Sequence, residues 1–121
     1  MREFLIVGIG GFLGTLARYG LGLAMKPWTA SFPWHTLTIN LVGCFLIGLL
    51  APLIGNHRPY WFVFVIPGLL GGFTTFSAFG YETLKLTQGG RPVLGLVYVL
   101  LSVAGGLGAA WISRFFGSIP K

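Results

Sequence analysis

Four long apolar stretches, separated by short connectors rich in proline, glycine and charge, constrain this chain more than any other feature. They run over residues 4–25, 36–54, 61–84 and 93–116. Each is close to the roughly 20 residues that a helix needs to cross a bilayer. Only 8% of the 121 residues are charged, against about 25% in a soluble domain. We therefore expect residues 1–121 to form one all-α integral membrane domain with four transmembrane helices.

The first stretch is predicted to be a span rather than a removed signal peptide. Arg18 and several glycines interrupt it, and no cleavage site of small residues follows a short apolar core. The expected location is therefore the cell (inner) membrane, crossed several times.

The third stretch has the least regular sequence, which is GGFTTFSAF over residues 71–79. Glycines weaken a helix, and hydroxyl side chains offer the backbone competing hydrogen-bond partners. Lipid tolerates a broken helix only where the break is buried in protein or lines a cavity. We expect a broken third helix, with half-helices joined at Gly71 to Thr74, and we expect the functional site there.

The sequence contains no pattern typical of an enzyme. It has no His/Cys cluster with zinc spacing, no phosphate-binding Gly-Lys loop and no plausible nucleophile–base pair. The single cysteine, Cys44, is expected to fill space in the second span. His35 and His57 fall in connectors, where we expect solvated or interfacial side chains. The net charge of +6 comes from residues at helix ends, which predicts contact with lipid headgroups rather than nucleic acid.

The basic residues are divided evenly between the two sides of the membrane. One side carries Arg2, Arg58, Arg114 and Lys121. The other carries Arg18, Lys26, Lys85 and Arg91. Because an excess of Lys and Arg normally sets orientation, the even division predicts dual topology. An antiparallel homodimer would follow, and the balance favours pairing of the chain with itself over pairing with a paralogue.

Pairs of small residues at helical spacing are typical of close contacts between membrane helices. Gly10 with Gly14 is one such pair, and Gly105–Ala109 and Gly106–Ala110 are two more. Contact between two chains and packing within one chain are equally good interpretations of these pairs.

Two polar side chains in the first spans need partners. The amide of Asn40, one turn after Thr36 on the same face, offers donors and an acceptor. It acts either in the functional site or as a contact between helices. Arg18 must pair, face water or bind carbonyls, although it is near enough to the span end to reach the interface.

Further candidates lie in the last two spans. Tyr98 and Ser102 are spaced i, i+4 on a thin polar stripe of the fourth span, and Glu82 falls near the end of the third, at a vestibule or interface. Phe76 and Phe79 share a face just beyond the break. The edge of a phenyl ring is electropositive, so two edges facing a narrow path favour an anion. The alternative is that both rings face the core or lipid.

Three segments in three spans together resemble one known family, the small fluoride channels of bacteria and other microbes (Fluc/CrcB). They are GGFLGTLARY at residues 10–19, NLVGCF at 40–45 and GGFTTFS at 71–77. The resemblance covers the whole chain. It implies an antiparallel, dual-topology homodimer with two separate fluoride pores.

The resemblance also implies residue roles. Asn40 donates to the anion, and the ring edges of Phe76 and Phe79 face it. Backbone carbonyls of Gly71 and Thr74 from both subunits hold a structural sodium ion on the two-fold axis.

By the same resemblance, further polar residues lie along or beside the pathway: Ser77, Tyr98 and Ser102. Glu82 stands near a pore entrance, and Arg18 either attracts anions or packs the dimer. Ala78 and Gly106 depart from the family pattern, because relatives commonly have Thr and some have Ser at these positions. Both departures reduce the number of hydroxyl contacts that the resemblance implies.

The expected function is passive export of fluoride from the cytoplasm through a selective channel. One alternative is a small multidrug-type, proton-coupled exporter. Such transport needs an embedded carboxylate, and the first span has only Glu3 at its start, while the second and fourth have none. The other alternative is a structural membrane subunit, which predicts no ion flux.

Overall fold

The computed structural model describes residues 1–117, and over these residues it consists of helices and short connectors. The α-helices are α1 (Arg2–Met25), α2 (Trp34–Ile54), α3 (Pro59–Val63), α4 (Gly71–Phe73), α5 (Phe76–Gln88) and α6 (Pro92–Gly117). Short 3₁₀ turns, η1 (Lys26–Trp28) and η2 (Gly55–His57), follow α1 and α2, and a π-helical run, η3 (Phe64–Leu70), links α3 to α4. Lys121, counted in the charge balance, lies outside the described residues.

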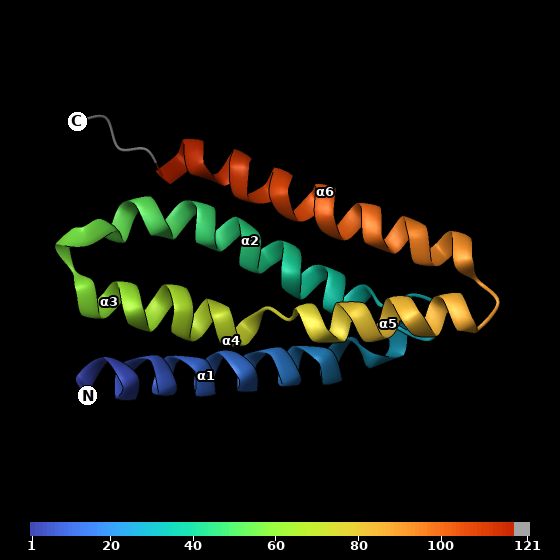
Figure 1. The fold of residues 1–121 in the computed structure, drawn as a ribbon, viewed down its shortest axis with the longest axis horizontal. Helices are drawn as coiled ribbons and strands as arrows, with labels where there is room; N and C mark the ends of the chain where they lie inside the picture. Colours follow the sequence, from blue (N-terminus) through green and yellow to red (C-terminus); the bar gives the residue numbers. More distant parts are fainter. Residues whose placement is uncertain (118–121) are drawn as a thin grey trace.

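The helices run up and down along one long axis (Figure 1). The N-terminus and the α2–α3 connection lie at one end, and the α1–α2 and α5–α6 connections lie at the other. Among the described residues, four helical stretches are long and apolar enough to cross a membrane: Arg2–Trp28, Trp34–Ile54, Pro59–Gln88 and Pro92–Gly117. The prediction of an all-helical chain with four such stretches is confirmed, with bounds a few residues wider than expected.

The third stretch changes its backbone geometry along its length. Pro67 lies inside the π-helical run η3, and it has no amide hydrogen for a helical bond. Gly71 and Gly72 are helical, as part of α4. The extended residues are Thr74 (φ −79°, ψ 156°) and Thr75 (φ −148°, ψ 121°). The extended backbone thus overlaps the joint predicted at Gly71 to Thr74 at its last residue, Thr74, and continues to Thr75.

Glycines let α1 lie directly on the backbone of the third stretch. A Cβ atom on Gly14 would overlap the carbonyl oxygen of Leu69, and one on Gly10 would overlap that of Phe64. Both glycines are buried within this one chain. Their pair therefore packs α1 against η3 and α4, which is the intrachain interpretation of the motif.

Small residues also bring α2 and α6 together. A Cβ on Gly48 would overlap the carbonyl oxygen of Ala110, and a Cβ on Gly106 would lie 3.3 Å from Cys44 Sγ. A Cβ on Gly105 would likewise lie too close to the side chain of Leu41. The small residues of α6 are thus occupied, at least in part, by packing inside the chain.

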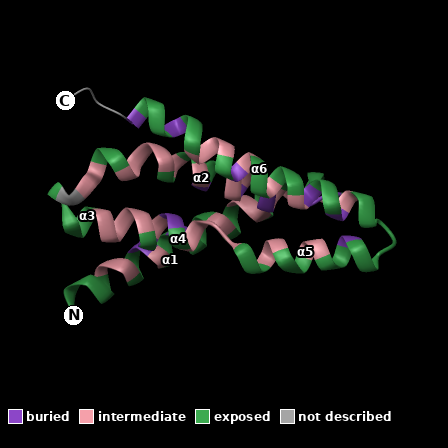
Figure 2. Cartoon of the chain, turned by 45° about the horizontal axis from the view of Figure 1, so that its top comes forward, coloured by how far each residue is buried: buried purple, intermediate pink, exposed green. Residues whose placement is uncertain are grey.

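The buried core is small and lies toward the end that carries the α1–α2 and α5–α6 connections. It contains Phe32, Leu37, Leu86 and Tyr98, of which Tyr98 is completely buried. Elsewhere most of the helical surface is exposed or half-buried (Figure 2). Apolar side chains that point outward suit a lipid or protein environment, which is consistent with a membrane bundle.

Candidate functional site

The side chain of Asn40 holds the extended backbone between α4 and α5. Asn40 Nδ2 donates to the carbonyl oxygen of Thr75 at 2.9 Å, and the Thr75 amide donates to Asn40 Oδ1 at 2.8 Å. The Asn40 side chain thus forms hydrogen bonds with both the amide and the carbonyl group of Thr75. One hydrogen of its NH₂ group is used, and the second is left for another acceptor.

Two carbonyls before the break lose their usual helical donors. In a continuous helix the Thr75 amide would bond to the Gly71 carbonyl, and the Ala78 amide to the Thr74 carbonyl. The Thr75 amide instead donates to Asn40, and the Ala78 amide donates to Thr75 Oγ1 at 3.2 Å. Thr75 is therefore the N-cap of α5. The carbonyls that lose their helical donors are those of Gly71 and Thr74, where sodium was predicted to bind.

A cavity of about 320 Å³ adjoins this break. We call it the phenylalanine cavity. Its lining comprises Asn40, Cys44, Thr74, Thr75, Phe76, Phe79, Ser102, Val103, Gly106 and Leu107. Four residues predicted for the anion pathway thus meet here, namely Asn40, Phe76, Phe79 and Ser102, together with Thr74 of the predicted sodium site. Ser102 Oγ is buried and has no hydrogen-bond partner among the described residues, so a donor is left unused at the cavity wall.

The two phenyl rings differ in their surroundings. Their centroids are 5.5 Å apart and the ring planes are tilted by 44°. The ring of Phe79 also lies 5.3 Å from that of Tyr98, which ties it to the core. Phe76 is 82% exposed, so this chain alone encloses only one of the rings.

Glu82 is the centre of a polar cluster that sequence reasoning only partly anticipated. Thr36 Oγ1 donates to Glu82 Oε1 at 2.7 Å, and the Tyr98 hydroxyl donates to Oε2 at 2.7 Å. His35 Nε2 lies 3.2 Å from Oε1. Tyr98 therefore contacts Glu82 rather than lining the phenylalanine cavity. His35, which we expected to be solvated or interfacial, is half-buried beside a carboxylate. The position of His35 directly before Thr36 in the sequence was the available sign that His35 belongs to this cluster.

Arg18 and Ser77 take positions near the break. Arg18 Nε donates to the Gly72 carbonyl at 3.1 Å, which fixes α1 to α4. Arg18 also lines a cavity of about 280 Å³ between α1, α2 and α5, which we call the α1–α5 groove; His35, Thr75 and Glu82 line it as well. The exposed Ser77 hydroxyl lies 3.3 Å from Thr75 Oγ1 and is not part of the phenylalanine cavity lining.

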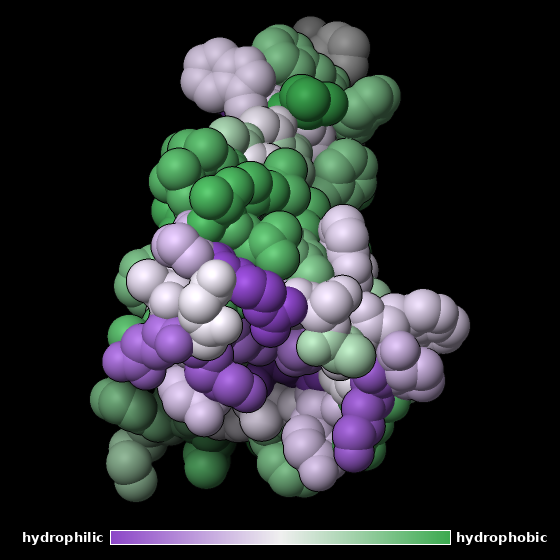
Figure 3. Space-filling view, turned by 90° about the vertical axis from the view of Figure 1, so that its right-hand side faces the viewer, coloured by the Kyte–Doolittle hydropathy of each residue, from purple (hydrophilic) through white to green (hydrophobic). Residues whose placement is uncertain are grey.

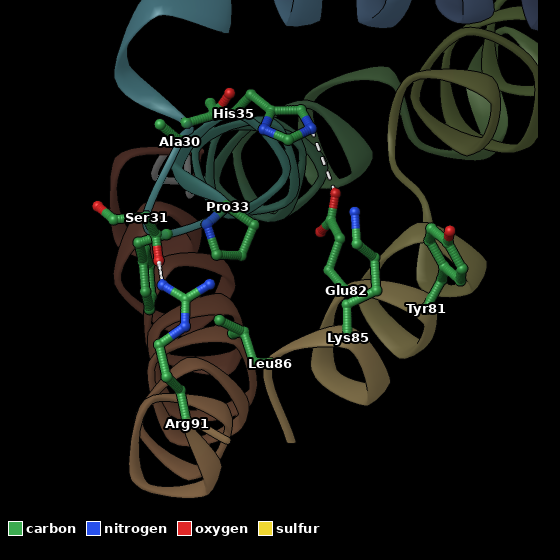
Figure 4. A pocket seen from close by; sticks show the side chains of 11 residues that line it. Ala30, Ser31, Pro33, His35, Tyr81, Glu82, Lys85, Leu86 and Arg91 are labelled. Atoms are coloured by element: carbon green, nitrogen blue, oxygen red, sulfur yellow. Dashed lines mark hydrogen bonds and ion pairs between the residues drawn. The ribbon is translucent and has the colours of Figure 1, made fainter. Parts of the chain in front are cut away.

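The end of the bundle with the α1–α2 and α5–α6 connections is polar and hollowed (Figure 3). A pocket of about 350 Å³ opens there, and we call it the mouth pocket. Its polar residues include His35, Glu82, Lys85 and Arg91. Arg91 Nη1 donates to the Ser31 carbonyl at 2.8 Å, which fastens the α1–α2 connector to the start of α6 (Figure 4).

Comparison with known proteins identifies the family. The model of a family described as "CrcB-like protein, Camphor Resistance (CrcB)" matches residues 5–114. The chain belongs to the CrcB family. The resemblance inferred from its three sequence segments is therefore confirmed.

Curated relatives of this CrcB-family protein align with most or nearly all of its length. A protein of Chlorobium phaeobacteroides named "fluoride-specific ion channel FluC" is 40% identical over 122 aligned positions, covering 98% of this chain and 95% of the relative. One of the same name from Thermus thermophilus is 44% identical, covering 97% and 96%. A third, from Ruminiclostridium cellulolyticum, is 46% identical, covering 86% and 83%.

These relatives test two further expectations for this CrcB-family protein, namely its location in the membrane and its not being an enzyme. With four apolar helices and ion-channel relatives, the chain is a multi-pass membrane protein. Because an ion channel catalyses no chemical step, the expectation that the chain is not an enzyme is also confirmed.

Proposed function

We propose that the chain forms a fluoride-selective channel that lets the anion leave the cytoplasm passively. One observation carries the proposal. The same cavity is lined by two phenyl rings, by a side-chain amide and by a hydroxyl; in the described part of the chain, one hydrogen of the amide and the hydroxyl have no protein partner. The names of the full-length relatives support fluoride as the ion.

The chemistry of the phenylalanine cavity suits a small, strongly hydrated anion. Removing water from such an ion is costly unless other donors replace it. Asn40 Nδ2, Ser102 Oγ and the electropositive edges of Phe76 and Phe79 are the replacements offered here. None of them carries a full charge, so the ion is stabilised without being trapped.

The cavities suggest a route to this site. The mouth pocket and the α1–α5 groove share His35 and Glu82, and the groove shares Thr75 with the phenylalanine cavity. We place the pathway along this series, with Ser77 and Tyr98 beside it and Arg18 facing the groove. An anion that follows it passes the Glu82 carboxylate before it reaches the rings.

The proposal includes an antiparallel, dual-topology homodimer with two pores. Phe76 and Gly71 are exposed in the single chain, next to carbonyls whose helical donors are diverted. Lipid cannot supply hydrogen bonds to such backbone, so at this depth it needs a protein neighbour. A second copy of the chain over this face would cover the break and enclose the exposed ring.

A structural sodium ion fits the same face. Hard cations prefer oxygen ligands, and the Gly71 and Thr74 carbonyls are released from helical bonding. Among the described residues, no group of three or more His, Cys, Asp or Glu side chains is arranged to hold a metal, so backbone carbonyls are the suitable ligands. We propose that these two carbonyls, from both subunits, hold sodium, whose charge offsets the carbonyl dipoles at the subunit contact.

Anion efflux from proteoliposomes tests the channel. The purified chain is reconstituted in liposomes loaded with fluoride or with chloride, and release is followed with ion-selective electrodes. Rapid fluoride release with chloride retained is expected. Silence for both ions, from protein whose helical fold is verified by circular dichroism, would reject a self-sufficient channel and favour a structural subunit.

A further inference from the structure

We infer that His35 is a positioning residue that compensates the charge of Glu82, so that fluoride passes faster when His35 is protonated. The inference rests on the proposed channel function and assigns a pH-dependent role to a residue outside the phenylalanine cavity. It begins from the contacts of the carboxylate.

Over residues 1–117, Glu82 has three side-chain partners within hydrogen-bond or ion-pair distance, and one of them, His35, can be positively charged. Thr36 and Tyr98 donate through neutral hydroxyls, each at 2.7 Å. His35 Nε2 is 3.2 Å from Oε1. The hydroxyls stabilise the carboxylate in its ionised form and leave its negative charge in place. Compensation by direct contact therefore depends on the imidazole.

The pair lies between two of the cavities on the proposed route. The His35 and Glu82 side chains are only 28% and 16% exposed, and both line the mouth pocket and the α1–α5 groove. Figure 4 shows Glu82 rising from α5 toward the imidazole on α2, joined by the ion-pair line. In so sheltered a position, a carboxylate repels an anion more strongly than it would in open water.

The other charged groups around the pair do not change charge near neutral pH. Lys85 and Arg91 line the mouth pocket, and Arg18 and Lys26 line the groove. Lysine and arginine ordinarily stay protonated until well above pH 9. The remaining titratable neighbours are the tyrosines of these linings and of the cluster, Tyr19, Tyr81 and Tyr98. Tyrosine ordinarily ionises near pH 10, so histidine is the switch near neutrality.

The second imidazole nitrogen adds to this argument. His35 Nδ1 is buried and has no partner among the described residues. Protonation at this atom would break no existing hydrogen bond of the chain. The positive charge that it adds would compensate the carboxylate, and this change favours an anion.

The first test is the pH profile of fluoride efflux, with equal pH on both sides of the membrane. Between about pH 8 and about pH 6, wild-type flux should rise roughly fivefold because a nearby carboxylate becomes compensated. Protein-free liposomes at each pH give the leak of the neutral acid, which is subtracted. His35→Gln should give a flat, low profile, and His35→Lys a flat, high one.

Two further variants sharpen the result. Glu82→Gln should abolish the pH dependence, because the charge to be compensated is gone. His57→Gln is the matched control, since His57 is the other histidine of the chain and lies in the α2–α3 connection. It should keep the wild-type profile. A wild-type profile that His35→Gln leaves unchanged would overturn the inference.

A readout without ion flux separates this inference from the channel proposal. With only two histidines in the chain, imidazole NMR resonances are assigned by the two His→Gln variants. Replacing Glu82 by Gln should change the chemical shifts of the His35 imidazole at one fixed pH and leave those of His57 in place, because of the two histidines only His35 contacts the carboxylate among the described residues. Absence of flux at every pH would reject the channel, whereas unchanged His35 resonances would reject the pairing itself.

Discussion

Asn40 and Thr75 are joined by a pair of hydrogen bonds, 2.9 Å from Nδ2 to the carbonyl oxygen and 2.8 Å from the backbone amide to Oδ1. They connect the middle of α2 to the residue that separates α4 from α5. A backbone left unpaired in this setting would cost several kcal/mol. Both interpretations of Asn40, as a contact between helices and as an anion donor, therefore concern one side chain, since one Nδ2 hydrogen serves Thr75 and the proposed channel uses the other for the ion.

Replacement of Asn40 by Asp should abolish fluoride efflux. Asn40→Asp keeps an acceptor for the Thr75 amide, but it puts a charge of the wrong sign on the cavity wall and an oxygen opposite the Thr75 carbonyl. We expect a loss of at least about a hundredfold in flux, since a like charge at close range costs several kcal/mol. Thr38→Val, elsewhere on α2, is the control and should conduct normally. Unchanged flux in Asn40→Asp would remove Asn40 from the pathway.

Substitutions of two serines of α6 should distinguish a role in fluoride conduction from a role in packing. Ser102 lines the phenylalanine cavity, and its buried Oγ has no hydrogen-bond partner within residues 1–117. Ser113 is completely buried, and its Oγ donates to the Ala110 carbonyl at 3.1 Å. Ser102→Ala should slow fluoride efflux about tenfold with little change in thermal stability. Ser113→Ala should conduct normally and lose about 1 kcal/mol of stability. The reverse pattern would mean that the Ser102 hydroxyl has no ligand.

Phe76 and Phe79 should promote fluoride efflux through the electropositive edges of their rings rather than through the volume that the rings fill. Phe79→Leu and Phe76→Leu keep an apolar side chain but remove the ring quadrupole. Each should reduce fluoride efflux by about tenfold or more, if one ring edge is worth about 1.4 kcal/mol to the ion. Phe115→Leu, at a surface position of α6 that is 68% exposed, is the control. Equal rates for all three variants would show that Phe76 and Phe79 only fill space.

The fit of α1 against the third stretch predicts a stability effect that depends on position. A Cβ on Gly14 would overlap the Leu69 carbonyl, while a Cβ on Gly20 of the same helix meets nothing within 4 Å. Gly14→Ala should destabilise the fold by about 3 kcal/mol or more, because rigid backbone must move. Gly20→Ala should be neutral or stabilising, since alanine favours the helix. Thermal unfolding in detergent compares them, and similar midpoints would refute this packing.

Local sequence predicted the parts of the fold that depend on local physics. The four helical stretches follow from the length of the apolar runs, because lipid requires helices of about 20 residues. The phenyl pair at Phe76 and Phe79 follows from helical spacing. The exact place of the interruption did not follow, because Gly71 and Gly72 are both helical in α4, where Gly72 packs against Gly11 of α1. Only the contact of Asn40 with Thr75, 35 residues away, fixes it.

Long-range contacts also explain what sequence reasoning missed in the polar cluster. Thr36 and Glu82 are 46 residues apart, and Tyr98 is 16 beyond Glu82. No periodicity relates such positions, so the cluster emerges only when α2, α5 and α6 converge. The same holds for the small-residue pairs, because spacing alone does not say whether the close neighbour belongs to the same chain. At Gly10 and Gly14 the neighbour is the chain's own third stretch.

The released carbonyls of Gly71 and Thr74 predict that sodium stabilises the assembled protein. At equal ionic strength, sodium should raise the unfolding temperature relative to a large organic cation such as N-methylglucamine. A ligand at a hundred times its dissociation constant contributes about 2.7 kcal/mol. In Asn40→Leu the Thr75 amide loses its acceptor and is free to bond to the Gly71 carbonyl again, so the sodium effect should shrink. Thr38→Val should retain it. Equal unfolding temperatures in both salts for the wild-type protein would rule out a structural sodium ion at this break.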